Sequence, residues 1–267
     1  MAAHAERTPQ FTEAIEERSW VAEFPWWLLI ILGIIGVMGL RIAFTDSYGQ
    51  AFESIVPGLR YTFYVTAAGF ILALILGLVA GLGRLSDNIV LRNLATAYIE
   101  FIRGVPVVVL ILTFGFVLVP MMADAAGVPV RNVPMALRAI IALAVIYGAF
   151  LAEVFRAGVE SVPPGQMEAA RSVGMTHVQA MRYIILPQAI RNILPALGND
   201  LIAILKDSSL VSLLAVREIT QEARLFTAST FRYAEGYLVL TVLYLSMTTV
   251  LSLLLQWYQA QIRKDAR

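Results

Sequence analysis

The sequence has no cysteine and few charged residues for its length. Without cysteine, the chain can form neither a disulfide bond nor a thiolate metal site. Only 15% of the 267 residues are charged and 59% are hydrophobic, whereas a typical soluble domain carries about 25% charged residues. The charged side chains are therefore too few to cover a water-facing surface. The apolar residues also occur in long runs, which is typical of an integral membrane protein.

Several chemical signatures are missing as well. The formal net charge is +1, so there is no basic field to indicate a nucleic-acid partner. A phosphate-binding loop needs a lysine after a glycine, but the two lysines, Lys206 and Lys264, follow leucine and arginine. The two histidines, His4 and His177, have no metal-ligand spacing. We therefore expect no catalytic residue, no metal site and no nucleic-acid ligand, and we expect any chemical energy source to reside on another polypeptide.

Six apolar runs have the length of a membrane span. A bilayer core about 30 Å thick is crossed by about 20 helical residues. We therefore expect an all-α polytopic membrane protein with six transmembrane helices, at residues 25–44, 60–84, 94–120, 138–157, 192–216 and 235–263. Six spans place both termini on one side of the membrane. Arginine and lysine are more frequent on that side, which predicts that the termini and the loop at 160–190 are cytoplasmic.

The 160–190 loop is the most informative segment. Ser161 is a predicted N-cap, and Gly174 is a predicted stop for the short helix that follows it. Thr176 and Gln179 have the spacing of a capping box and predict a second short helix. Connections between helices are usually only a few residues long. A structured loop of this length therefore favours a docking surface over an ordinary surface connection.

The same loop resembles the E-A-A motif of ABC importer permeases, which reads E-A-A, three residues, G, nine residues, I-x-L-P. This sequence matches every spacing with Glu168-Ala169-Ala170, Gly174 and Ile184-x-Leu186-Pro187. In that family the first helix of the loop is the coupling helix. It sits in a groove of a separate ATP-binding subunit and converts nucleotide-driven closure into rocking of the membrane helices. The resemblance implies that the ATPase-coupling residues are Gly165, Gln166, Glu168, Ala169, Ala170, Gly174 and Pro187.

Three further phrases, at 98–106, 152–159 and 197–211, resemble the polar amino acid uptake branch of these permeases, which carries histidine, arginine, glutamine or glutamate. The common pattern in that branch has five core spans, so the first apolar run departs from it. The resemblance divides the chain into a cytoplasmic tail, an additional N-terminal transmembrane helix, a five-helix importer core containing the 160–190 coupling loop, and a second cytoplasmic tail. The four parts lie at residues 1–24, 25–44, 57–258 and 259–267.

The resemblance also implies partners. A permease of this kind works in the bacterial cytoplasmic (inner) membrane by alternating access, surrounded by the lipid bilayer. It pairs with a second permease chain, identical or related, and with two ATP-binding subunits. Those subunits hold ATP and Mg, so the permease itself needs no cofactor. An extracytoplasmic amino acid-binding protein delivers the substrate.

Polar residues interrupt the third, fourth and fifth runs. A charge near the bilayer centre costs a few kcal/mol, so it usually pairs or lines a water-filled path. The candidates for a translocation path or for gating are Glu100, Arg103, Glu153, Asp200, Lys206, Asp207, Ser208 and Ser209. Two structural alternatives stay open. Glu100 and Arg103 are spaced i, i+3 and can simply pair with each other, and a Glu153–Lys206 salt bridge can simply fix helix packing.

Other interpretations also stay open at this point. Gly104 and Pro106 predict a kink in the third run, which is either a hinge or a packing irregularity. A secondary transporter would use Glu153 and Asp200 to bind protons or sodium, but it has no need of the coupling loop. A membrane scaffold without a path fits the spans but gives no reason for charges on several of them. A mechanosensitive or ligand-gated channel is a third alternative.

Overall fold

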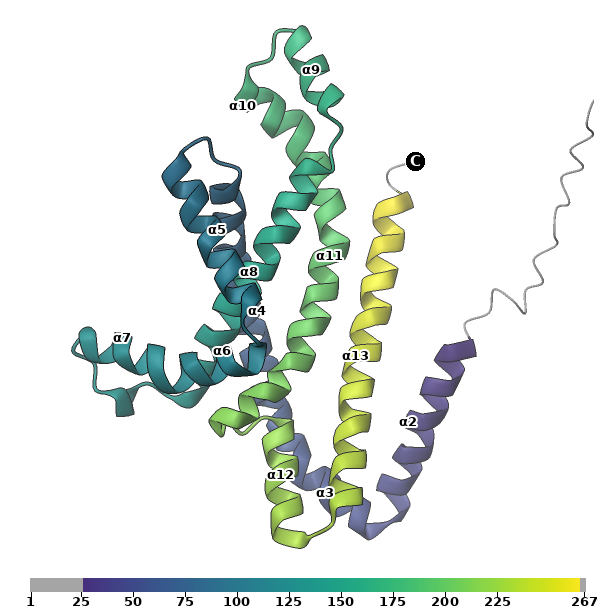
Figure 1. The fold of residues 1–267 in the computed structure, drawn as a ribbon. Helices are drawn as coiled ribbons and strands as arrows, with labels where there is room; N and C mark the ends of the chain where they lie inside the picture. The colour runs from purple at the N-terminus through teal and green to yellow at the C-terminus, as the bar shows by residue number, and fades with distance from the viewer. Residues whose placement is uncertain (1–25, 265–267) are drawn as a thin grey trace, which may run out of the picture.

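The computed structural model describes residues 26–264, without the side chains of 262–264, and this part of the chain is built from helices (Figure 1). The predicted tail at 1–24 and residues 265–267 of the second tail lie outside the described residues. The α-helices are α2 (Trp26–Phe44), α3 (Asp46–Ile55), α4 (Leu59–Arg84), α5 (Ile89–Gly104), α6 (Val107–Thr113), α7 (Val119–Ala125), α8 (Met135–Glu160), α9 (Pro164–Ser172), α10 (His177–Ala180), α11 (Leu186–Asp207), α12 (Ile219–Thr230) and α13 (Tyr233–Lys264). Three 3-10 segments and two π-helical turns join them: η1 (Val56–Gly58), η3 (Val130–Asn132) and η5 (Ser208–Leu214) are 3-10, and η2 (Phe114–Leu118) and η4 (Met181–Ile185) are π-helical.

Five helical stretches in the described part of the chain are long and apolar enough to cross a membrane: Trp26–Phe44, Asp46–Arg84, Val107–Ala125, Met135–Glu160 and Tyr233–Gln261. The remaining predicted run, 192–216, corresponds to most of α11 together with η5. With 22 residues, α11 is about 33 Å long and can cross the bilayer core. Its charged residues, among them Asp200 and Lys206, explain why apolar composition alone does not identify it.

The central packing unit is the pair α4 and α8. Gly77 on α4 lies so close to α8 that an added Cβ would be 2.7 Å from the Cβ of Leu151. Since lipid tails are as apolar as leucine, close backbone approach of this kind is a main source of helix association in a membrane. Around this contact lies the main core, whose fully buried members include Val65, Leu143, Ile146, Ile204 and Leu214.

A second apolar cluster lies at the end of the molecule opposite α9 and α10 (Figure 1). It joins α3, α12 and α13 through Ile55, Ile219, Phe226 and Val239. The additional helix α2 meets α3 and α13 here and has no buried residue. Its half-buried positions are Leu28, Ile31, Ile35, Met38 and Ile42. Their alternating spacing of three and four residues is that of a narrow helix-packing seam, so α2 leans on the core along one line.

The third predicted run is interrupted rather than continuous. Its helix α5 ends at Gly104, Val105 is extended at φ −113° and ψ 137°, and α6 begins after Pro106. The predicted kink is therefore confirmed as a full break, because proline disfavours helical conformation in the residue before it. Beyond the break, α6 and α7 turn away from the line of α5 (Figure 1).

A buried arginine supports this turned segment. Arg138 at the start of α8 is 7% exposed and donates to the carbonyl oxygens of Val130, Val133 and Gly115 at 2.8, 3.1 and 3.3 Å. Gly115 belongs to the π-helical turn η2, where the regular α-helical hydrogen-bond pattern is interrupted. The guanidinium thus binds carbonyl oxygens of the irregular segments η2 and η3 and of Val133, and their dipoles compensate its charge.

Candidate functional site

The coupling loop begins where α8 ends, at Ser161. The prediction that Ser161 is the N-cap of the following helix is wrong. Ser161 has helical angles, φ −70° and ψ −15°, whereas an N-cap residue adopts an extended conformation. It caps α8 instead: its N–H donates to the Ala157 oxygen and its hydroxyl to the Gly158 oxygen. Asn192 on α11 donates to the same hydroxyl at 2.8 Å, so the base of the loop is tied across both flanking helices.

The helix α9 has an inner and an outer face. Met167 and Ala170 turn inward, against the cluster formed by Val162, Ile185, Ala189 and Ile193. The predicted coupling residues Gly165, Gln166, Glu168 and Ala169 are exposed. Ala170, which the motif also includes, supports the helix from beneath. The loop is therefore a rigid base carrying a short helix with an uncovered polar face.

Gly174 forms the corner between the two loop helices. Its φ is +88°, a left-handed conformation that glycine adopts without steric cost. Around it, the Gly174 N–H donates to the Arg171 oxygen and the Met175 N–H to the Ala170 oxygen, the pattern that closes the end of a helix at glycine. The next helix opens with the predicted capping box. Thr176 N–H donates to Gln179 Oε1 at 2.9 Å, and Gln179 N–H donates to Thr176 Oγ1 at 3.3 Å.

Pro187 does not end the helix. The π-helical turn η4 comes directly before α11, in which Pro187 occupies the first turn. A π turn absorbs the hydrogen-bond shift that proline causes, because proline has no N–H to donate. Helical structure therefore continues from His177 to Asp207. The second helix of the loop and the charged residues of α11 thus lie on one helical stretch, to which α9 is joined through the Gly174 corner.

The first group of predicted path residues gathers around Glu153 on α8. Glu153 pairs with Arg84, with Arg103 at 3.6 Å, and with Arg156 at 2.8 Å. Glu100 pairs with Arg84 at 3.5 Å. Neither ion pair considered from the sequence is formed. Glu100 pairs with Arg84 and not with Arg103, and Glu153 pairs with arginines and not with Lys206.

The second group lies at the far end of α11. Asp207 Oδ2 accepts a hydrogen bond of 2.8 Å from the Tyr147 hydroxyl of α8. Ser208 is fully buried and donates to the Leu205 oxygen. Asp200 and Ser209 are half-buried and Lys206 is exposed. At this point the helix changes from α to the 3-10 segment η5, so the polar side chains cluster where the backbone is irregular.

The sequence missed three members of these groups: Tyr147, Arg84 and Arg156. Tyr147 is 2% exposed and belongs to the main core. Nothing in a single sequence links it to Asp207, because the contact joins two helices far apart in the chain. Arg84 and Arg156 lie at or beyond the ends of apolar runs, where the sequence indicates a loop arginine rather than a partner of Glu153.

The structure has a cavity beside the arginine cluster and another at the opposite end of the molecule. The first, of about 390 Å³, lies between α8 and α11, with Glu153, Ala157, Ser161, Asn192 and Ala196 in its wall. Its volume is within the range of small-molecule sites, about 300–1,000 Å³.

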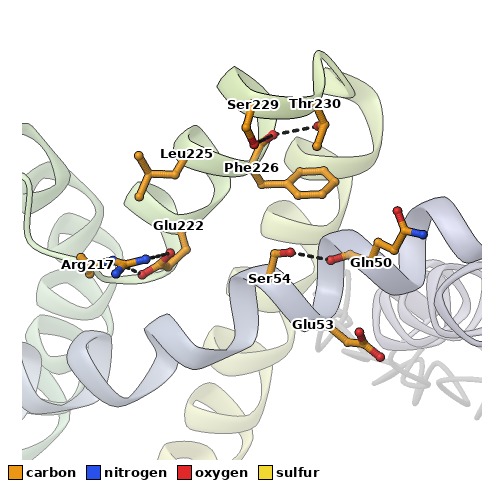
Figure 2. Close-up of a pocket in the computed structure, with 9 residues that line it drawn as sticks. All are labelled: Gln50, Glu53, Ser54, Arg217, Glu222, Leu225, Phe226, Ser229 and Thr230. Atoms are coloured by element: carbon orange, nitrogen blue, oxygen red, sulfur yellow. Dashed lines mark hydrogen bonds and ion pairs between the residues drawn. The ribbon is translucent and has the colours of Figure 1, made fainter.

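The other cavity, of about 700 Å³, is an open groove on the opposite end, between α3 and α12 (Figure 2). Figure 2 shows Arg217 forked onto Glu222, with Nε–Oε1 and Nη2–Oε2 distances of 2.8 and 3.0 Å. Ser54 donates to its own helix, at the Gln50 oxygen. These side chains form a fixed polar wall.

Beside this groove, Glu218 caps the start of α12. Its carboxylate is fully buried and accepts from the N–H groups of Thr220 and Gln221 at 2.8 Å, and from the Tyr244 hydroxyl at 3.1 Å. Burial raises the pKa of Glu218 to about 7, although these hydrogen bonds act in the opposite direction. The carboxylate thus joins α12 to α13, and it does so in a place that disfavours its charge.

Comparison with known proteins gives consistent matches. A family model described as "Binding-protein-dependent transport system inner membrane component" matches residues 69–264. The chain is 36% identical to the probable amino-acid permease protein YxeN of Bacillus subtilis (strain 168), over 82% of this chain and 95% of the relative. It is 32% identical to the glutamine transport system permease protein GlnP of Escherichia coli (strain K12), over 80% and 94%. A solved amino acid ABC transporter with histidines matches with a TM-score of 0.71 and 37% identity, over 80% of this chain and 95% of that one.

Proposed function

Because the chain belongs to the family of binding-protein-dependent transport system inner membrane components, we propose that it carries a polar or charged amino acid through the bacterial inner membrane as the permease of an ATP-driven importer. Its relatives named above are permeases of amino acid or glutamine transport systems. The chain is a transport subunit rather than a catalyst, and ATP hydrolysis belongs to separate subunits of such importers.

The coupling loop is the observation that carries this proposal. It presents the exposed residues Gly165, Glu168 and Ala169 of α9 on a rigid apolar base. Beyond the Gly174 corner, the second helix of the loop continues without interruption into α11, which bears Asp200 and Asp207. A force applied by an ATP-binding subunit at α9 therefore passes around this corner and then along one helical stretch to the charged residues.

Importers of this family work with ATP-binding subunits and with substrate-binding proteins. For this chain we propose two ATP-binding subunits, which hold ATP and Mg, and a second permease chain that completes the pathway. The coupling loop and both termini would then be cytoplasmic. The α3–α12 groove at the opposite end (Figure 1) faces outward, where the binding protein arrives.

The proposed translocation path runs along α8 and the far half of α11. Asp200, Lys206 and Asp207 offer charges of both signs, which complement the ammonium and carboxylate groups of an amino acid. Ser208 and Ser209 extend the polar surface. Glu100, Arg103 and Glu153 lie in the separate arginine cluster, and we assign them to gating.

The proposed mechanism is alternating access. ATP binding closes the pair of motor subunits, the coupling helices follow, and the path opens outward to accept the amino acid. Hydrolysis then returns the path to its inward-open state. The protein's own residues supply the docking face, the continuous helix and the charges along the path.

The test is purification from the native membrane in mild detergent, followed by mass identification of all bound polypeptides. We expect an ATP-binding subunit to co-purify and to be lost when Glu168 is changed to lysine. Recovery of the chain alone, with substrate movement driven by an ion gradient in vesicles, would contradict the proposal and favour a secondary transporter.

A further inference from the structure

The two carboxylate oxygens of Glu153 have different partners. Oε2 is held on its own helix by Arg156, whose Nε and Nη2 lie 3.1 and 2.8 Å away. Arg156 is in turn paired with Glu160. Oε1 faces two arginines from other helices: Arg84 at the end of α4 and Arg103 near the end of α5. One oxygen therefore orients the carboxylate, and the other joins three helices.

The helices α4 and α5 form a hairpin, closed by a short turn at 85–88. In α5 only Ile99 and Ile102 are buried, so the apolar attachment of this helix is small. Arg103 lies directly before the break at Val105 and Pro106. Whereas α4 packs closely on α8 along its length, α5 is held to α8 largely by a few contacts, among which the Tyr98–Val145 hydrogen bond and the Glu153–Arg103 ion pair are prominent.

On the other side, Glu153 belongs to the last two turns of α8, which leads directly into the coupling loop. Asn192 and Ser161 fasten that end of α8 to α11. Motion of the coupling helix is therefore passed to α8 at the position from which Glu153 contacts the hairpin.

We propose that Glu153 is a positioning residue, a shared ion-pair acceptor that makes α5 follow the coupling loop during transport, directly through Arg103 and indirectly through Arg84, which also pairs with Glu100 of α5. This inference rests on the proposed function. When the ATP-binding subunits move the coupling loop, α5 then moves with it, so that the cytoplasmic end of the path opens and closes as one unit.

This arrangement of ion pairs tolerates movement. Arg84 and Arg103 share Oε1 of Glu153. A shift of α5 can therefore weaken the Arg103 contact while the Arg84 contact still compensates the charge of the carboxylate. The side chains of Glu153 and Arg84 are 20% and 23% exposed, and partly buried pairs are screened less than exposed ones. Arg103 is 47% exposed, which leaves it the freedom to move. Without the carboxylate, Arg103 would lose its ion pair and Arg84 would keep only the longer contact with Glu100, at 3.5 Å.

The primary experiment compares Glu153→Gln with Glu160→Gln in the complete complex in liposomes, with ATP-binding subunit and binding protein present. Glu160 is the matched control, since it lies about two turns away on the same helix and pairs with Arg156. We measure amino acid molecules imported per ATP hydrolysed. For Glu153→Gln we expect this ratio to fall about tenfold while hydrolysis continues. For Glu160→Gln we expect the wild-type ratio. A wild-type ratio in Glu153→Gln would overturn the inference.

A second variant guards against a failure of Glu153→Gln to assemble. Arg103→Gln removes the more exposed partner of Glu153 and leaves the Arg84 pair in place.

Distance measurements report the effect of this variant. The chain has no cysteine, so labels can be attached at Leu94→Cys of α5 and Val178→Cys of α10, both exposed. They report the distance between α5 and the coupling loop. In the wild-type background we expect that distance to stay constant when ATP binds, and in Arg103→Gln to change or broaden. Equal distance distributions in both backgrounds would overturn the inference. Absence of ATP-driven import in the wild type would instead overturn the proposed function.

Discussion

The hydroxyl of Tyr147 on α8 donates to Asp207 Oδ2 at the end of α11, at 2.8 Å. The two helices that enter and leave the coupling loop are thereby joined again near the other end of α11. The Asn192–Ser161 hydrogen bond joins them at the loop itself. The segment from α8 to α11 thus behaves as a closed hairpin, and movement at its loop end is transmitted to the charged residues at its other end.

Replacement of Tyr147 by phenylalanine tests this relationship. The change keeps the ring that packs edge-on against Phe150 at 5.7 Å and removes only the donor to Asp207. A hydrogen bond to a charged group contributes about 1.5–3 kcal/mol, so we expect the apparent affinity for substrate to fall about tenfold. Tyr98→Phe is the control, because that hydroxyl donates to the Val145 carbonyl. Equal effects of the two changes would show that Tyr147 acts on packing alone.

Neutralisation of the half-buried Asp200 tests the proposed path. Asp200→Asn keeps the side-chain volume and removes one negative charge. We expect uptake of a cationic amino acid to decrease about tenfold or more and uptake of a neutral one to change less, because the lost interaction is charge-assisted. Competition uptake with a panel of cationic, neutral and anionic amino acids measures the difference. A uniform decrease for all of them would contradict a role for Asp200 in substrate recognition.

Charge reversal on the exposed face of α9 tests docking. We expect Glu168→Lys to abolish most ATP-driven transport and to leave membrane insertion intact, since the side chain is exposed and supports no internal contact of the loop. Asp124→Lys, at an exposed site on α7, makes the same change of charge away from the loop. Normal transport by Glu168→Lys, or an equal loss in both variants, would count against the docking face.

A matched pair of glycine changes tests the corner of the loop. Gly174 has φ +88°, where alanine costs about 1–2 kcal/mol. Gly165 lies in the first turn of α9 and an added Cβ meets nothing within 4 Å. We therefore expect Gly174→Ala to weaken retention of the ATP-binding subunit during purification. Gly165→Ala should leave the fold of the loop intact, with a stabilising contribution of up to about 1 kcal/mol. The melting temperatures of both variants provide the structural comparison.

Glu218 predicts a pH dependence of stability. Its pKa is raised from 4.5 to about 7 in the folded protein, so the folded state binds the proton more tightly than the unfolded state. The resulting stabilisation is fully present below about pH 4.5 and is lost as the pH rises to about 7, a change on the order of 3 kcal/mol. We expect Glu218→Gln to flatten the slope of melting temperature against pH in this range. Glu222→Gln, whose carboxylate pairs with the exposed Arg217, should keep the slope, and an unchanged slope in Glu218→Gln would contradict the prediction.

The sequence was most informative where structure depends on local chemistry. The capping box at Thr176, the corner at Gly174 and the break near Pro106 all follow from backbone preferences of single residues, and all are found. Ser161 shows the limit of the same reasoning. Ser161 lies between two helices, and the sequence does not decide which of them it caps. The structure places it at the end of α8, and Pro163 takes the N-cap position of α9.

The ionic partners could not be predicted because they depend on which helix faces meet. Glu100 is well spaced to pair with Arg103 along α5, yet it contacts Arg84, because the α4–α5 turn brings that arginine beside it. Tyr147 and Asp207 meet only through the packing of α8 on α11. Such contacts join residues distant in the chain and leave no periodic signal in one sequence.

Uptake by the purified complex in liposomes tests the central claim most directly. The measurement compares import of a labelled polar amino acid under two conditions: ATP with Mg and no ion gradient, and proton or sodium gradients without ATP. The account predicts uptake that requires ATP, the ATP-binding subunit and an intact Glu168, and that is indifferent to the gradients. Uptake driven by a gradient in the absence of ATP would contradict it.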